Sequence, residues 1–153
     1  MTITITGESA MKALEDCVDE MGREYVYEAE GADTEDSCAY IHNVKNEGFG
    51  SEFDTYSVTP DSVPGCLIGH ALVKLGVPMK TFLDLGLNTG HDASEALLKL
   101  KQERIVDFPN EVQFQAVVSA YNRAQYRQDS GHGWGVALDV ALSSYRNSIL
   151  ADQ

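Results

Sequence analysis

Basic residues are few in this chain of 153 residues. Eleven lysines and arginines stand against 24 aspartates and glutamates, so the formal net charge is −13 at pH 7. A charge of this sign repels nucleic-acid phosphates and anionic lipid headgroups. Direct binding of nucleic acid or of an anionic membrane surface is therefore not expected.

Long apolar runs and secretory features are missing as well. The densest apolar stretch, residues 66–73, is interrupted by His70 and is far shorter than the ~20 residues of a membrane span. The N-terminal segment MTITITGESAMK lacks the basic part and the following apolar part of a signal peptide. Three cysteines, an odd number, do not make a closed disulfide framework. Together these absences predict a cytoplasmic protein without membrane association.

Common catalytic and ion-binding motifs are also absent. The chain has no G-x-x-x-x-G-K-[ST], G-x-G-x-x-G, G-x-S-x-G or H-E-x-x-H motif. The spacing from Asp84 to Glu95 partly follows a calcium-binding loop, but Thr89 stands where that loop needs glycine. The usual routes to nucleotide binding, hydrolysis and calcium binding therefore have no support.

Hydrophobic spacing predicts a single α+β domain over residues 1–153. Apolar residues three and four positions apart predict an amphipathic helix over 8–21. Alternating or β-forming residues predict short strands at 2–6, 25–27, 38–42 and 55–58. We expect these strands to form a small antiparallel sheet in the N-terminal half.

The second half of the chain is expected to be helical. Helices are predicted at about 64–76, at 79–85, at 92–101, from Pro109 onwards and at 134–149. The Gly-His-Gly segment at 131–133 separates the last two helices, and so short a connection predicts an antiparallel helix pair. The small sheet should therefore pack on about four or five helices.

Acidic residues concentrate between positions 8 and 36. This segment contains eleven acids and only two bases, Lys12 and Arg23, so it carries −9 of the total −13. We expect it to bind a basic protein partner, with an acidic loop at about 28–37. The candidate contact residues in that loop are Glu28, Glu30, Asp33, Glu35 and Asp36. The alternatives are a solvated face that maintains solubility and mimicry of nucleic-acid charge.

Cys66 and His70 share one face of the helix predicted at 64–76, away from its main apolar arc. A cysteine in the first turn of a helix has a lowered thiol pKa, because the helix N-terminus stabilises a thiolate. Cys66 and His70 are therefore candidate catalytic residues of a cysteine-dependent enzyme. In the simpler alternative, Cys66 is a small core residue and His70 makes a polar contact with the small sheet.

Zinc is the one cofactor that the sequence suggests. Cysteine and histidine are typical zinc ligands, and Cys38, Cys66 and His70 could converge. His42 cannot join Cys38 on the same ion, because residues four apart in a strand are separated by ~13 Å. The chain also lacks a C-x-x-C knuckle. The alternative is that both cysteines are core residues and that no cofactor is bound.

Four segments carry a resemblance to known proteins: YVYEAEG (25–31), SCAYIH (37–42), PGCLIGHALVKLGVP (64–78) and QDSGHGWGVALDVAL (128–142). In this order, they resemble segments of small uncharacterised proteins from actinobacteria and their phages. The middle segment is the most specific. The resemblance implies a phage-encoded or actinobacterial protein in the cytoplasm of the host cell, and it implies no activity.

The leading hypothesis is thus a non-enzymatic, acidic interaction or regulatory protein, phage-encoded and able to modulate its host through a basic protein partner. One alternative is a metal-binding protein or cysteine-dependent enzyme centred on Cys66 and His70. The other is a structural or assembly protein, for which a homo-oligomer formed through the C-terminal helix pair would be expected.

Overall fold

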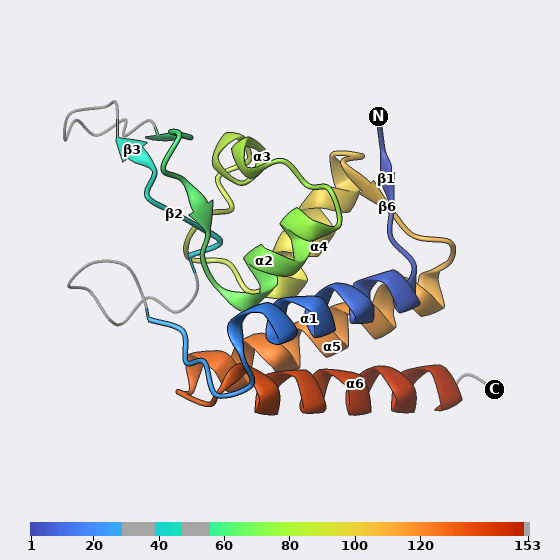
Figure 1. Ribbon diagram of the computed structural model, residues 1–153. Helices are drawn as coiled ribbons and strands as arrows, with labels where there is room; N and C mark the ends of the chain where they lie inside the picture. Colours follow the sequence, from blue (N-terminus) through green and yellow to red (C-terminus); the bar gives the residue numbers. More distant parts are fainter. Residues whose placement is uncertain (29–38, 47–55, 152–153) are drawn as a thin grey trace.

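Helices make up most of the chain, as the apolar spacing predicts, and short strands make it a mixed α+β protein. The computed structural model describes residues 1–28, 39–46 and 56–151 (Figure 1). The helices in this part of the chain are α1 (Gly7–Met21), α2 (Leu67–Lys74), α3 (Met79–Asp84), α4 (Ala93–Gln102), α5 (Glu111–Asp129) and α6 (Trp134–Ala151).

Local side-chain hydrogen bonds set where two of these helices begin. At α4 the two residues of a capping box bond to each other's backbone: Asp92 accepts from the Glu95 N–H at 2.8 Å, and Glu95 accepts from the Asp92 N–H. Thr6 and Ser9 form the same reciprocal pair at α1. Each pair satisfies backbone donors that the first turn of a helix leaves without a partner.

The prediction of one antiparallel sheet is wrong, because the strands form three separate pairs. The strands are β1 (Ile3–Thr4), β2 (Ile41–His42), β3 (Lys45–Asn46), β4 (Tyr56–Ser57), β5 (Val63–Pro64) and β6 (Val106–Asp107). Among the described residues, β2 pairs with β5 and β3 with β4, both antiparallel, whereas β1 pairs in parallel with β6. The N-terminal strand therefore lies against a strand that follows α4 and that the sequence analysis did not predict.

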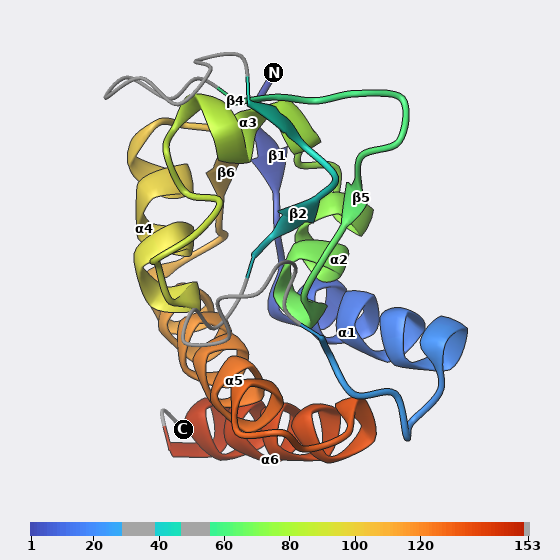
Figure 2. The same cartoon turned by 90° about the vertical axis from the view of Figure 1, so that its left-hand side faces the viewer.

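The core lies around α5, which contacts α1, α2, α4 and α6. Tyr121 of α5 is fully buried, and its hydroxyl donates to the Ala10 carbonyl oxygen of α1 at 2.8 Å. Figure 2 shows α5 and α6 side by side at the base, with the strands above them. α5 and α6 run in opposite directions and are joined by residues 130–133, so the predicted antiparallel helix pair is present.

Candidate functional site

Trp134, at the start of α6, is the centre of a buried junction. Its ring is fully buried between the edges of two others, with centroid distances of 4.6 Å to Tyr25 and 5.2 Å to His70. The backbone N–H groups of Trp134 and Gly135 each donate at 2.8 Å, to the carbonyl oxygens of Tyr25 and Arg23 respectively. The segment after α1 therefore caps the N-terminus of α6, where backbone donors need partners. Residues 25–27 form no strand, so the strand predicted there is wrong.

His70 belongs to this junction, so the expectation that it faces the small sheet is wrong. Its ring packs edge-on against Trp134, and its Nδ1 lies 3.1 Å from the Cys66 carbonyl oxygen one helical turn earlier. Burial lowers the pKa of the imidazole, because a charged ring would lose its hydration there. The histidine thus joins α2 to α6 through packing, which the spacing within α2 could not reveal.

Cys66 is the N-cap residue of α2, fully buried and disulfide-bonded. A sulfur in a disulfide has no thiolate with which to attack a substrate or bind zinc. Disulfide bonds are rare in a reducing cytoplasm. This bond therefore does not support the cytoplasmic location predicted from the odd number of cysteines. Cysteine chemistry at Cys66 and His70 therefore stays a prediction for the reduced chain.

The predicted zinc set is also untested, since Cys38 lies outside the described residues. Within residues 1–28, 39–46 and 56–151, no three histidine, cysteine, aspartate or glutamate residues gather closely enough to hold a metal ion. Cys17, the remaining cysteine, is a free and fully buried residue of α1. Burial raises the pKa of its thiol to about 12, which makes it a poor nucleophile at neutral pH.

Two buried glutamines of α5 hold the starts of two other helices, and the sequence analysis missed both. Gln125 Oε1 accepts from the Ala93 N–H of α4 at 2.6 Å, and Gln128 Oε1 accepts from the Leu67 N–H of α2 at 2.7 Å. Both glutamines are almost fully buried. Their spacing of three residues within the inward stripe of α5 was the available signal. They position the elements of the junction and have no chemistry of their own.

Tyr27 and His42 link the segment after α1 to β2. The Tyr27 hydroxyl lies 2.9 Å from His42 Nε2 and accepts from the Ala39 N–H at 3.1 Å. Two glycines let α2 approach this region: a Cβ added at Gly65 would meet the Ala39 carbonyl oxygen, and one at Gly69 the Tyr40 carbonyl oxygen. The described parts of the segments that carry the sequence resemblance therefore meet at this end of the molecule, through hydrogen bonds as well as packing.

The outward side of α1 is acidic. Within α1, five acids (Glu8, Glu15, Asp16, Asp19 and Glu20) and one base (Lys12) give a charge of −4. Lys12 pairs with Asp16 at 3.1 Å, and Lys74 of α2 pairs with Glu20. The side chains of Glu8, Glu15 and Asp19 are exposed and have no ion pair within the described part of the chain. We call these three residues the acidic face of α1.

The predicted acidic loop continues from this region, but little of it can be placed. Glu28 is exposed. Glu30, Asp33, Glu35 and Asp36 lie outside the described residues. Their part in partner binding therefore stays a prediction.

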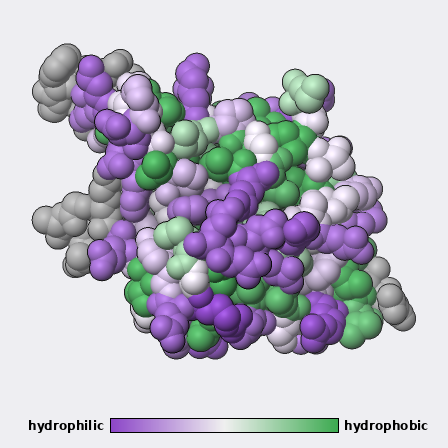
Figure 3. Space-filling view, in the orientation of Figure 1, coloured by the Kyte–Doolittle hydropathy of each residue, from purple (hydrophilic) through white to green (hydrophobic). Residues whose placement is uncertain are grey.

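A groove of about 450 Å³ lies beside the acidic face, between α1 and α6. Its lining residues are Glu8, Met11, Lys12, Glu15, Leu142, Tyr145, Arg146, Ile149 and Leu150. Figure 3 shows the surface there: a hydrophilic band runs over α1, and hydrophobic surface lies below it and near the end of α6. Leu150 is 57% exposed, a large apolar side chain open to solvent. We call this feature the α1/α6 groove.

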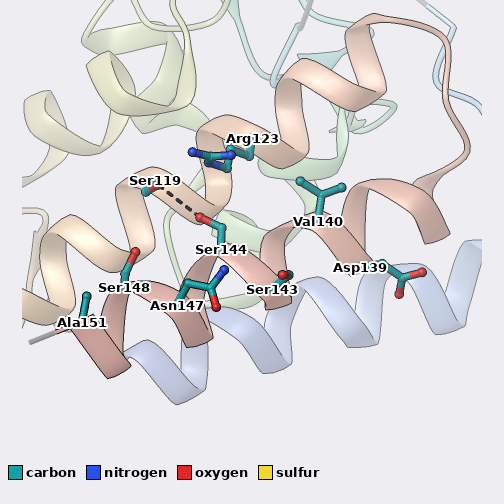
Figure 4. A pocket seen from close by; sticks show the side chains of 9 residues that line it. All are labelled: Ser119, Arg123, Asp139, Val140, Ser143, Ser144, Asn147, Ser148 and Ala151. Atoms are coloured by element: carbon teal, nitrogen blue, oxygen red, sulfur yellow. Dashed lines mark hydrogen bonds between the residues drawn. The ribbon is translucent and has the colours of Figure 1, made fainter. Parts of the chain in front are cut away.

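A second groove, of about 510 Å³, lies between α5 and α6, and most of the residues that line it are polar (Figure 4). Ser119 of α5 and Ser144 of α6 are hydrogen-bonded across it at 3.1 Å. Arg123 lies at one side, and the remaining lining comes from α6: Asp139, Val140, Ser143, Asn147, Ser148 and Ala151. Asp139, the carboxylate of this lining, is paired with Arg23 at 2.6 Å, and we assign the groove no reaction.

Comparison with known proteins does not extend these observations. No family model matches the chain, and neither a curated protein nor a solved structure matches it. None of the helices in the described part of the chain combines the length and hydrophobicity that a bilayer crossing requires.

Proposed function

We propose that this chain is a non-enzymatic interaction protein that binds a basic protein partner through the acidic face of α1. The observation that carries the proposal is the exposure of Glu8, Glu15 and Asp19, which have no ion pair with any residue that the structure describes and lie beside a groove with an apolar floor. Exposed like charges cost little in water and speed the encounter with a partner of opposite charge. The nearby apolar surface provides the area that a stable complex must bury.

The partner is a protein and not a nucleic acid or an anionic membrane, because the same charge repels both of the latter. The sequence resemblance favours a partner from an actinobacterial host, and in that setting the complex would modulate a host process. The acidic loop extends the binding surface if Glu30, Asp33, Glu35 and Asp36 also contact the partner. Cysteine or zinc chemistry plays no part in this function.

Affinity capture from an actinobacterial host, followed by titration of the purified partner, tests the proposal. The variant Glu8→Gln/Glu15→Gln/Asp19→Asn should weaken the complex about tenfold, since each exposed charge contributes up to ~1 kcal/mol. Its binding should also depend less on salt concentration. Neutralising Glu28, Glu30, Asp33, Glu35 and Asp36 in a separate variant measures the contribution of the loop.

The matched control is Asp61→Asn/Glu103→Gln/Asp107→Asn, which removes three exposed acids elsewhere and changes the net charge equally. This control should leave the affinity within about twofold of wild type, because surface charges far from an interface are screened. Equal weakening by both variants would show that net charge alone attracts the partner. Capture of an acidic partner, with binding insensitive to salt, would refute the proposal.

A further inference from the structure

The α1/α6 groove is long enough to hold one more helix of about two turns. Its α1 side runs from Glu8 to Glu15 and its α6 side from Leu142 to Leu150, so each spans about two turns, or ~11 Å. The two helices run in opposite directions along it, as Figure 1 shows. Lining residues recur three and four positions apart on both helices, which is the spacing that an added helix would meet.

The floor of the groove is apolar, and Tyr145 forms part of it. Tyr145 lies across the N-terminus of α1, so close that a Cβ at Gly7 would overlap its ring. Met11 is almost buried, whereas Leu150 is exposed at the open end. Apolar surface is therefore covered at Met11 and open to solvent at Leu150.

Charge on the rim is asymmetric. Glu8 and Glu15 line the α1 side without an ion pair among the described residues, while Lys12 between them is paired with Asp16. Arg146 stands on the α6 side. A helix in this groove would thus gain most from basic side chains directed toward α1 and apolar side chains directed at the floor.

We propose that the α1/α6 groove binds one amphipathic, basic helix of about two to three turns from the protein partner. This inference rests on the proposed function and adds the form of the partner and the place where it docks. A second copy of this chain is a poor occupant, because two molecules with a charge of −13 each repel one another. A strand is disfavoured too, since the groove is lined by helices and presents no strand edge.

The probe for this proposal is a synthetic 14-residue peptide of leucine and lysine, with the leucines three and four positions apart. A peptide of the same composition, with leucine and lysine alternating, carries the same charge without forming a helical apolar face. NMR titration of the isotope-labelled protein should place the largest amide shifts on α1 and α6, at residues lining the groove. The helical peptide should also bind at least tenfold more tightly than the alternating one.

Leu150→Asp tests the floor, and Val136→Asp is its matched control. Both residues are exposed apolar positions on α6, but only Leu150 lines the groove. Leu150→Asp should weaken binding of the helical peptide about tenfold, because it removes apolar area that the leucines would cover and sets a charged group against them. Val136→Asp should change the affinity less than twofold, and circular dichroism should show both variants folded.

Three results would overturn the proposal: equal binding of the two peptides, equal effects of Leu150→Asp and Val136→Asp, or amide shifts centred away from α1 and α6. A wild-type dimer in sedimentation that Leu150→Asp dissociates would show that a second copy occupies the groove. Failure of the groove is separable from failure of the proposed function. If neutralising Glu8, Glu15 and Asp19 weakens the natural complex while Leu150→Asp does not, the acidic face binds and the groove does not.

Discussion

The Trp134 junction and the α1/α6 groove are both built on α6, and they differ in how completely their side chains are covered. At the junction, Trp134 is fully buried between two rings, and backbone donors of α6 meet carbonyl oxygens from the segment after α1. At the groove, Leu150 is exposed and Glu8 lacks an ion pair in the described part of the chain. The first region holds the fold together, whereas the second is left open to bind.

Replacing Trp134 by alanine should have the largest effect, because it removes the ring that Tyr25 and His70 enclose. We expect a loss of about 3–5 kcal/mol in the free energy of unfolding, measured by denaturant titration. Tyr126→Ala, at a ring that is 69% exposed, should cost less than about 0.5 kcal/mol. Similar losses for the two variants would mean that the junction is not a stabilising centre.

Alanine substitutions at Gly69, next to His70 of the junction, and at Gly7, beside the groove, should differ in their effect on stability. At Gly69 the new Cβ would collide with the Tyr40 backbone, so Gly69→Ala should cost about 1–3 kcal/mol. At Gly7 it would meet only the Tyr145 side chain, which can rotate into the open groove. Gly7→Ala should therefore lower the melting temperature less, and a greater loss at Gly7 would contradict this difference.

The smallest effect is a pH dependence that arises at the junction. Because burial lowers the pKa of His70 in the folded state, the unfolded chain takes up a proton first as the pH falls below about 6.5. The free energy of unfolding should therefore be highest above this pH and decline below it, until the folded histidine is protonated as well. Urea titrations between pH 5 and 8 measure this decline.

His70→Phe should flatten that pH profile, since it keeps a ring against Trp134 but removes the titrating group. His132→Gln, which removes an imidazole from the loop before α6, is the matched control and should leave the profile close to wild type. A profile that is unchanged in His70→Phe would show that other groups cause the acid sensitivity.

Helix positions were predictable because their signals are local. The apolar spacing of α1, the box formed by Asp92 and Glu95, and the short Gly-His-Gly connection each lie within a few residues of the element that they specify. The acidic character of α1 was equally readable, because it depends on composition and spacing alone.

Strand pairing and the surroundings of His70 were not predictable in the same way. β1 pairs with β6, about a hundred residues later in the chain, and nothing near residues 3–4 indicates that partner. For His70, the helical spacing excluded the main apolar face but could not indicate Trp134, which lies 64 positions further along the chain. The capping roles of Gln125 and Gln128 were missed because glutamine within a helix usually faces water.

The sequence alone determined that this chain is acidic, largely helical and concentrates its negative charge near α1, because these properties follow from residue type and short-range periodicity. Only the tertiary structure decided that His70 packs on Trp134 and that an apolar groove opens between α1 and α6. Both depend on contacts between residues far apart in the chain, where the packing of whole helices determines which side chains are buried and which stay exposed.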